Sequence, residues 1–313
     1  MSTATIEAVD LCRNFGKFCA VDKVSFAVEG GEIFGYLGAN GAGKSTTIRM
    51  LCGLLAPSSG RAHVAGFDVG RTPEAVKASI GYMSQKFSLY LDLPVKANVD
   101  FFGGAYGLSG RTLASRATEV LEQCGLAGHE RATTGALPSG HRQRLALACA
   151  ILHRPAVLFL DEPTACVDPQ ARRLFWQVIR QLASEETTIF VTTHYLDEAE
   201  YCRRIGLMAA GRLIALDTPA ELKRAYVPGR VLSVRGRDLA SAAAALRRQA
   251  GITAVEPFGA GLHLQVAGER WSEDQVTRAI EAAGGREVVV EAGEASLEDV
   301  FLAALGKAKE TAA

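Results

Sequence analysis

The stretch Gly38-Ala-Asn-Gly-Ala-Gly-Lys-Ser45 decides the fold of this chain. It fits the pattern GxxxxGK followed by Ser or Thr, and it lies between a strand-like run at 33–37 and a helical stretch at 45–54, the context that a phosphate-binding loop requires. The glycines let backbone N–H groups curl around phosphate oxygens, and the helix N-terminus adds a partial positive charge. Lys44 is therefore expected to reach the β- and γ-phosphates of a nucleotide, and Ser45 to bind Mg²⁺.

Two carboxylates, Asp161 and Glu162, follow the apolar run at 157–160. Such a run predicts a buried strand, and ligands of α/β folds bind at the carboxyl edge of the sheet. Asp161 is placed to hold Mg²⁺, directly or through water, and Glu162 to polarise an attacking water. Because an Asp-Glu pair after a strand is also common in ordinary loops, this interpretation depends on the phosphate-binding loop.

Two more polar residues follow predicted strands. His194 comes after the strand-like run at 188–192, and Gln85 follows another at 80–83. A histidine at this sheet edge can contact a γ-phosphate and orient the water, whereas a glutamine can reach Mg²⁺ or the water. Without the phosphate-binding loop, each would be interpreted as a structural or solvated side chain.

Strand-like and helical patterns alternate over the first part of the chain, which predicts an α/β fold with a mainly parallel sheet. The stretch at about 86–150 is mostly helical and is expected to form a helical subdomain. We place this first domain at residues 1–225.

The pattern changes after residue 225, where Pro228-Gly229 signals a turn. The order strand, helix, strand, strand, helix, strand that follows predicts a small α+β domain of ferredoxin-like arrangement at 230–306. A last helix is expected to begin after Ser296 as N-cap, with Asp299 completing a capping box.

The composition limits the class of protein. The 313 residues include 34 Lys+Arg and 34 Asp+Glu, so the basic excess usual in nucleic-acid-binding proteins is missing and no nucleic acid is expected as partner. The longest apolar runs fall well short of the roughly twenty residues that cross a bilayer. The N-terminal residues do not have the pattern of a signal peptide, and seven cysteines without CxxC pairs indicate reduced thiols.

The order of these motifs over about residues 5–220 resembles that of the ABC transporter ATPase family, a branch of the P-loop NTPases. The resemblance implies that Phe15 stacks on adenine, that Asp168 is the aspartate of the D-loop, and that two ATP-binding domains enclose two ATP molecules. It implies catalytic roles for Lys44, Gln85, Glu162 and His194, and Mg²⁺ ligands at Ser45, Gln85 and Asp161. It implies that ATP is bound by Phe15, Gly38, Asn40, Gly41, Ala42, Gly43, Lys44, Ser45, Thr46, Ser139 and Gly140.

Three segments are similar to the multidrug and antibiotic (daunorubicin-type) exporter branch of that family. They are the residues around the phosphate-binding loop, the stretch Gln85-Lys-Phe-Ser-Leu-Tyr, and Ser296-Leu-Glu-Asp-Val-Phe. The resemblance implies an ATPase subunit that powers export of a small molecule through separate transmembrane permease subunits. Such a subunit is expected to be cytoplasmic, peripheral on the inner face of the plasma membrane, and paired as a homodimer or heterodimer.

The signature segment of this family departs from its usual Leu-Ser-Gly-Gly-Gln, because residues 137–141 read Leu-Pro-Ser-Gly-His. Pro138 replaces the serine whose hydroxyl meets the γ-phosphate, and it has no N–H to donate. We expect Ser139 to cap the following helix and to offer its own hydroxyl instead. The D-loop also differs, since Ala165-Cys166 stands where Ser-Gly is common.

Two alternatives stay open. A soluble ABC ATPase outside transport would usually carry two ATPase domains or long coiled-coil inserts, and neither pattern is present. A catalytically weak regulatory subunit is suggested by the altered signature, against which Lys44, Asp161, Glu162 and His194 are all intact. The cargo and the direction of transport do not follow from the sequence.

Overall fold

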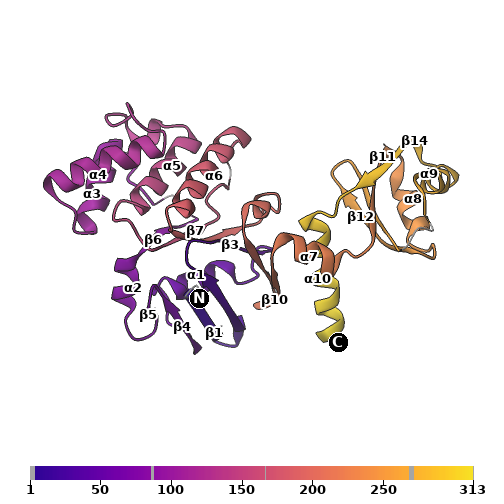
Figure 1. Cartoon of the computed structure of the whole chain (residues 1–313), viewed down its shortest axis with the longest axis horizontal. Helices are drawn as coiled ribbons and strands as arrows, with labels where there is room; N and C mark the ends of the chain where they lie inside the picture. The colour runs from indigo at the N-terminus through magenta and orange to yellow at the C-terminus, as the bar shows by residue number, and fades with distance from the viewer. Residues whose placement is uncertain (1–3, 86–87, 166, 268–270, 313) are drawn as a thin grey trace. The chain divides into compact units, whose positions relative to one another are not determined.

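The computed structural model describes residues 4–85, 88–165, 167–267 and 271–312. The chain divides into two compact units, Met1–Leu216 and Asp217–Ala313 (Figure 1). The elements of the first unit are β1 (Ala4–Phe15), β2 (Phe18–Glu29), β3 (Ile33–Gly38), α1 (Lys44–Leu51), β4 (Ser59–Val64), β5 (Phe67–Asp68), α2 (Pro73–Ser79), β6 (Ile80–Met83), α3 (Val95–Ala105), α4 (Gly110–Gln123), η1 (Thr134–Ala136), α5 (Ser139–Ala150), β7 (Val157–Asp161), α6 (Pro169–Ser184), β8 (Thr188–Thr193), η2 (Glu198–Tyr201), β9 (Arg204–Ala209) and β10 (Arg212–Asp217). Those of the second unit are α7 (Pro219–Tyr226), β11 (Arg230–Arg237), α8 (Leu239–Leu246), β12 (Ile252–Phe258), β13 (Gly261–Val266), α9 (Glu273–Ala282), β14 (Arg286–Gly293) and α10 (Leu297–Ala312).

A six-stranded sheet of order β10-β9-β3-β8-β7-β6 forms the centre of the first unit. The pairs β6–β7, β7–β8, β8–β3 and β3–β9 are parallel, as the alternation of strands and helices predicted. Every residue of β3, β7 and β8 is buried, as expected of parallel strands with both faces of the sheet covered, and the buried residues of β8 include three threonines. The predicted α/β fold with a mainly parallel sheet is confirmed.

A second, antiparallel sheet of order β2-β1-β4-β5 was not predicted. Buried and exposed residues alternate along part of β2, as expected of a sheet with one face on a core, and β1 pairs with both β2 and β4 through several shifts of register. Those shifts interrupt the regular alternation by which a strand is recognised from sequence.

Aromatic side chains join the two sheets. The ring of Phe26 on β2 lies 5.6 Å from Phe34 and Tyr36 on β3 and 5.8 Å from Phe190 on β8. These contacts lie within one buried apolar cluster of the first unit, and large buried rings contribute much of the apolar area removed from water. This packing holds β3 in place, and the phosphate-binding loop begins where β3 ends.

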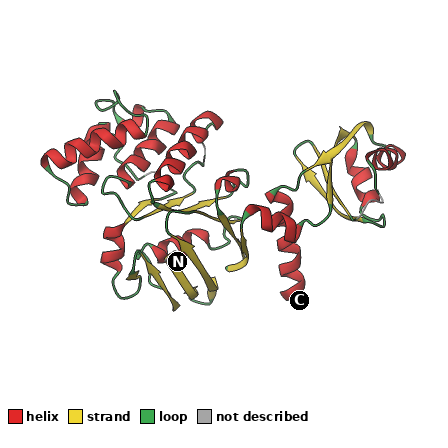
Figure 2. Cartoon of the chain, in the orientation of Figure 1, coloured by secondary structure: helices red, strands yellow, loops and turns green. Residues whose placement is uncertain are grey.

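The stretch at 86–150, expected to be helical, contains α3, α4, η1 and α5 (Figure 2). Asn98 on α3 is completely buried and binds Tyr90 twice, through its side-chain oxygen and nitrogen. Its amide nitrogen also donates to Thr134 Oγ1 over 3.0 Å. One buried amide therefore joins the segment before α3 to the segment before α5.

The second unit contains a four-stranded sheet of order β12-β13-β11-β14, in which all neighbouring strands are antiparallel. Helices α8 and α9 pack against it through an apolar cluster that includes Leu232, Leu264 and Ile280. The unit begins at Asp217, earlier than the predicted boundary at 225–230, because α7 packs with α10 of the same unit. The predicted capping box is present, since Asp299 N donates to Ser296 Oγ and Ser296 N to Asp299 Oδ2.

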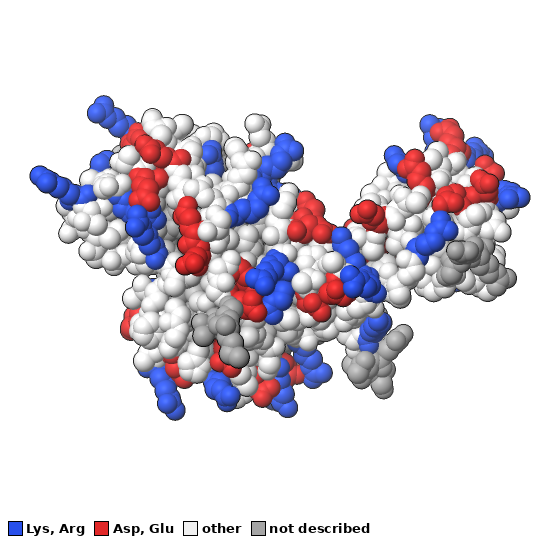
Figure 3. All heavy atoms as spheres, in the orientation of Figure 1, with Lys and Arg blue, Asp and Glu red and all other residues white. Residues whose placement is uncertain are grey.

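In the part of the chain that the structure describes, no helix has both the length and the apolar character needed to cross a membrane. Basic and acidic side chains are interspersed over each unit on the face drawn in Figure 3. Cys166 lies outside the described residues, and the six cysteines inside them are free: Cys12, Cys19, Cys52, Cys124, Cys149 and Cys202.

Candidate functional site

The phosphate-binding loop connects β3 to α1, as the sequence predicted. Gly43 has φ +107°, and a Cβ at this position would lie 2.6 Å from the carbonyl oxygen of Ala20. Only glycine tolerates that backbone angle together with so close an approach of β2. The turn brings the Lys44 side chain back over the loop, where Nζ donates to Gly38 O over 2.7 Å and to Ala39 O over 3.2 Å.

Ser45 and Asp161 meet at the end of the parallel sheet. Ser45 Oγ donates to Asp161 Oδ1 over 3.1 Å, although 116 residues separate the two in the chain. A hydroxyl and a carboxylate are the hard oxygen ligands that Mg²⁺ prefers, and both converge beside the N-terminus of α1. These residues fit a magnesium ion bound together with nucleotide phosphates.

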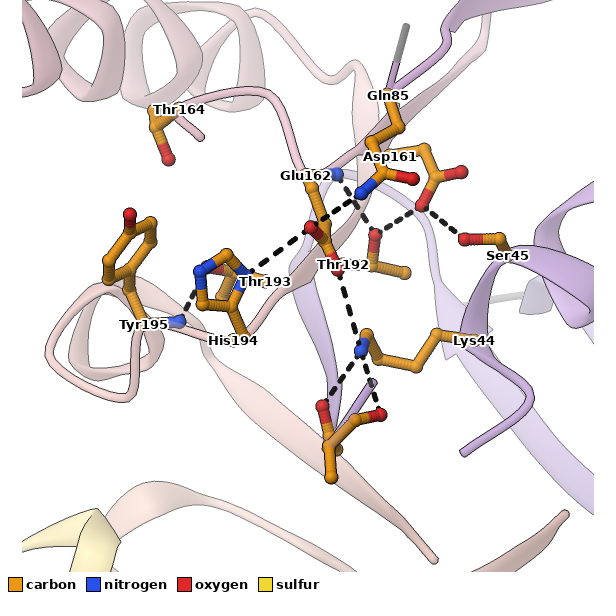
Figure 4. A network of polar contacts seen from close by, with 12 residues as sticks. Lys44, Ser45, Gln85, Asp161, Glu162, Thr164, Thr192, Thr193, His194 and Tyr195 are labelled. Atoms are coloured by element: carbon orange, nitrogen blue, oxygen red, sulfur yellow. Dashed lines mark hydrogen bonds and ion pairs between the residues drawn. The ribbon is translucent and has the colours of Figure 1, made fainter. Parts of the chain in front are cut away.

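Glu162 lies at the centre of the site and is 7% exposed. Lys44 Nζ is 3.5 Å from its Oε1, Gln85 Nε2 donates to its Oε2 over 2.9 Å, and His194 Nδ1 is 3.3 Å from Oε2 (Figure 4). Its backbone has φ +50°, a conformation that non-glycine residues rarely adopt and that needs support from surrounding structure. The structure thus brings together the four residues predicted to be catalytic.

Thr192 supplies that support, and the sequence reasoning missed it. Its Oγ1 donates to Asp161 Oδ1 over 2.7 Å and accepts from Glu162 N at 3.0 Å, while Thr192 O also accepts from Glu162 N at 3.1 Å (Figure 4). The signal that could have identified Thr192 is a hydroxyl near the carboxyl end of a buried strand, two residues before His194.

Burial keeps two neighbouring titratable groups neutral. It raises the pKa of Tyr82 to about 12, and the negative charge of Asp161 adds to the effect. It also raises the pKa of the Cys52 thiol well above its usual value, again with a smaller contribution from Asp161. Neither the phenol nor the thiol is therefore a candidate nucleophile at neutral pH.

Phe15 lies at the end of β1, where its ring is 48% exposed and the Arg13 guanidinium carbon is 4.7 Å from the ring centroid. The neighbouring strand β2 contributes Ala20, whose carbonyl contacts the phosphate-binding loop at Gly43. The hairpin that carries Phe15 thus lies beside the loop, with the ring available to a ligand.

The expectation that Ser139 caps α5 is wrong. Pro138 is the N-cap residue, no side chain forms a capping hydrogen bond, and Ser139 is the first residue of the helix. Gly140 has a packing role, because a Cβ there would lie 2.5 Å from the Cβ of Ala171 on α6. Among the described residues, neither Ser139 nor Gly140 takes part in the polar contacts that Lys44, Gln85 and His194 make with Glu162.

The remaining predicted residues lie around this centre. Asn40 and Gly41 are exposed in the loop, Ala42 is buried, and Thr46 is in the first turn of α1. Asp168 is the N-cap of α6 and accepts hydrogen bonds from the backbone nitrogens of Gln170 and Ala171. Lys86 and Phe87, which belong to the segment similar to the exporter branch, lie outside the described residues.

Comparison with known proteins agrees with this geometry. Residues 21–165 match the family described as ABC transporter. The chain is 52% identical over 218 residues to a protein of Escherichia coli (strain K12) named probable multidrug ABC transporter ATP-binding protein YbhF; the match covers 70% of this chain and 38% of that protein's length. It is 36% identical over 315 residues to the daunorubicin resistance ATP-binding protein DrrA2 of Streptomyces coeruleorubidus, covering 99% of this chain and 98% of the relative.

A solved structure shows the same fold. The cbiO1 protein of Clostridium perfringens, described as part of the ABC transporter complex cbiONQ, matches with a TM-score of 0.64 and 28% identity, over 70% of this chain and 90% of the other. The phosphate-binding loop, the Asp161–Glu162 pair and the match over nearly the whole of a relative lead to one conclusion. The chain belongs to the family of ABC transporter ATP-binding proteins.

Proposed function

We propose that the chain binds and hydrolyses ATP to power the export of a drug- or antibiotic-like small molecule through separate transmembrane permease subunits. The observation that carries this proposal is the convergence of Lys44, Gln85 and His194 on the buried carboxylate of Glu162, beside the phosphate-binding loop. A water held between Glu162 and a γ-phosphate would meet a proton acceptor on one side and a cation on the other.

ATP would bind with its phosphates along the loop. Lys44 would contact the β- and γ-phosphates, while loop N–H groups and the N-terminus of α1 would surround the other oxygens. Phe15 would stack on adenine. Mg²⁺ would be held by Ser45, Asp161 and Gln85, and when bound it would neutralise charge that develops on the phosphates. The remaining contacts would come from Gly38, Asn40, Gly41, Ala42, Gly43 and Thr46.

Glu162 would accept the proton of the attacking water, and His194 and Gln85 would orient that water. Glu162 is oriented for this task, since its backbone is bound to Thr192 and both carboxylate oxygens have partners. His194 keeps a 37% exposed side chain, which leaves one side of the imidazole open toward a ligand. Positioning of this kind supplies most of the catalysis in phosphoryl transfer.

A second ATP-binding domain, from a copy of this chain or from a different protein, would complete the site by placing its own signature segment over the ATP. Ser139, exposed at the start of α5, would present its hydroxyl there, and Gly140 would allow the close packing behind it. Permease subunits as partners are supported by the similarity to cbiO1 of Clostridium perfringens, which is part of a transporter complex.

The names of YbhF and DrrA2 support a drug- or antibiotic-like cargo, and a permease partner would hold the chain at the inner face of the plasma membrane. We also propose that residues 230–306 form a ferredoxin-like accessory domain, which is supported by the sheet order β12-β13-β11-β14 and by helices α8 and α9.

The test has two arms. Glu162→Gln keeps the size of the side chain but removes the proton acceptor, so ATP turnover should fall by about 10² to 10⁴-fold while binding of a fluorescent ATP analogue persists. The matched control is Glu186→Gln, an exposed glutamate after α6. Unchanged turnover in Glu162→Gln would contradict the assigned role.

The second arm identifies the partner. Affinity capture of Glu162→Gln from solubilised membranes, with Mg-ATP and without nucleotide, should recover a multi-span membrane protein. Recovery of ribosomal or DNA-bound partners instead would support a soluble ATPase. A wild-type chain that fails to turn over ATP even with its membrane partner would support a regulatory subunit, for which the altered signature at Pro138 is the specific indication.

A further inference from the structure

Glu198 is a buried carboxylate that the proposed chemistry does not use. It is 1% exposed and begins the short helix η2, four residues after His194. Its Oε1 accepts a hydrogen bond from Thr164 Oγ1 over 2.5 Å, and its Oε2 accepts one from Thr193 Oγ1 over 2.9 Å. A carboxylate removed from water is costly, so these partners must compensate for lost hydration.

Arg172 on α6 provides the opposite charge. Its Nε lies 3.3 Å from Glu198 Oε1, an ion-pair distance whose geometry is not that of a hydrogen bond. The guanidinium carbon of Arg172 also lies 4.0 Å from the ring centroid of Tyr195, an arrangement in which a cation is attracted to an aromatic face. Arg172 thus contacts both the buried carboxylate and the residue that follows His194.

The two threonines bound by Glu198 flank the proposed catalytic residues. Thr164 lies two residues after Glu162, and Thr193 immediately precedes His194. Thr193 Oγ1, which donates to Glu198, also accepts a hydrogen bond from Tyr195 N at 3.0 Å (Figure 4). One carboxylate therefore joins the loop after β7 to the last residue of β8, and the residues on both sides of His194 are held through Thr193 Oγ1.

We propose that Glu198 is a positioning residue that keeps His194 within reach of Glu162. His194 itself is more than one-third exposed, and its imidazole is 3.3 Å from Glu162 Oε2. The position of His194 therefore depends on its backbone. The Thr193 hydroxyl orients that backbone by accepting from Tyr195 N, and Glu198 holds the hydroxyl in place by accepting a hydrogen bond from it. This inference rests on the proposed hydrolysis of ATP, in which His194 orients the water.

The chemistry of the carboxylate sets the expected order of variants. Alanine at 198 leaves both threonine hydroxyls without their acceptor and removes the ion pair with Arg172, which keeps Asp197 Oδ2, at 3.8 Å, as an acidic partner. Glutamine keeps one acceptor oxygen, and its amide can donate to a lone pair of the other threonine, but it loses the ion pair with Arg172. Loss of positioning should therefore be larger in Glu198→Ala than in Glu198→Gln.

The first measurement is steady-state ATP hydrolysis by the full chain. Glu198→Ala should lower kcat by about 10- to 100-fold, the size of effect that misplacement of a catalytic group produces, and leave KM for ATP within about twofold. In a His194→Ala background the same change should cost less than about twofold, because the residue that Glu198 positions is already gone. An equal loss in both backgrounds, or no loss in either, would overturn the proposal.

Glu32 offers a matched control. It is 2% exposed and paired with Arg204, whose Nε lies 3.1 Å from Glu32 Oε2, but it precedes β3 and so lies at the opposite end of the sheet from the loop. Glu32→Ala should lower the unfolding temperature and leave kcat unchanged. If Glu198→Ala does not fold, Glu198→Gln and Thr193→Val provide the same comparison with smaller changes.

Backbone hydrogen exchange gives a readout that does not depend on turnover. Exchange over residues 193–196 should increase in Glu198→Ala and stay at the wild-type level in Glu32→Ala, because Tyr195 N would lose its oriented acceptor. Unchanged exchange would overturn the proposal whatever the ATPase result. A wild-type chain that exchanges as expected but hydrolyses no ATP would contradict the proposed function alone.

Discussion

Thr192 Oγ1 donates to Asp161 Oδ1 over 2.7 Å, although the two residues lie on different strands, β8 and β7. The same oxygen accepts the backbone N–H of Glu162 at 3.0 Å. One hydroxyl therefore orients the proposed magnesium ligand and the backbone of the proposed catalytic base, and both carboxylates should depend on it.

Thr192→Val keeps the shape of the side chain and removes this hydroxyl. The folded state should lose about 1–3 kcal/mol, because Asp161 loses a hydrogen bond in a buried site. Turnover should also require more Mg²⁺, because Asp161 is no longer oriented toward Ser45. Urea unfolding and a Mg²⁺ titration of ATPase activity measure the two effects.

Thr188→Val is the control for that experiment. Thr188 is 1% exposed at the other end of β8, where its Oγ1 accepts from Gly31 N at 3.0 Å. This variant should lose stability and keep the wild-type Mg²⁺ requirement. Equal Mg²⁺ requirements in both variants would contradict the role assigned to Thr192.

Gly43→Ala should abolish nucleotide binding. The added Cβ would lie 2.6 Å from Ala20 O, and alanine at φ +107° is strained, so the loop must move away from β2. Gly107→Ala separates the backbone strain from the steric clash, since Gly107 also has a positive φ, +80°, but nothing lies within 4 Å of the added Cβ. That control should cost only about 1 kcal/mol and bind nucleotide normally, as measured by calorimetry.

Ser139→Ala tests whether this hydroxyl replaces that of the usual signature serine. Since Ser139 is exposed and forms no helix cap, its removal should leave the unfolding temperature unchanged. ATP turnover should fall by about tenfold, corresponding to one lost hydrogen bond to a charged oxygen of about 1.5 kcal/mol. Ser115→Ala, on the exposed face of α4, is the control. Turnover equal to the control would show that Ser139 does not substitute.

His153 should make the first unit less stable in mild acid. Burial lowers its pKa, with a smaller contribution from Arg116, although the hydrogen bond to Ile80 O acts in the opposite direction. The unfolded chain takes up a proton near pH 6.5 that the folded chain resists, so stability is fully present above that pH and decreases as the pH falls toward the folded pKa.

In the wild type, the His153 and Tyr106 rings are stacked with their centroids 3.6 Å apart. His153→Phe keeps a ring that can stack on Tyr106 but removes the titratable group. The free energy of unfolding should therefore change less between pH 7.5 and pH 5.5 in the variant than in the wild type. Parallel pH profiles of the two proteins would rule out this role for His153.

The sequence by itself determined the parallel sheet and the chemical groups of the site. Buried parallel strands are short apolar runs, and the residues at their carboxyl ends must meet at one edge, so the sequence alone was enough to place Asp161, Glu162 and His194 together. The loop at 38–45 could be assigned because its glycines and Lys44 are required by local geometry: the glycines let the backbone turn around a phosphate, and Lys44 follows them directly. The capping box of Ser296 and Asp299 is likewise local, and it was predicted correctly.

Only the tertiary structure decided the antiparallel sheet, the true N-cap of α5, and the supporting contacts of Thr192 and Glu198. In that sheet, β1 pairs with the distant strand β4, and its pairing with both β2 and β4 contains register shifts, which leave a weak local pattern. Pro138 is the N-cap because its backbone is still extended, with ψ 153°, and Ser139 is already the first helical residue. Hydrogen bonds such as that from Thr164 to Glu198 join residues 34 positions apart, and no sequence period encodes them.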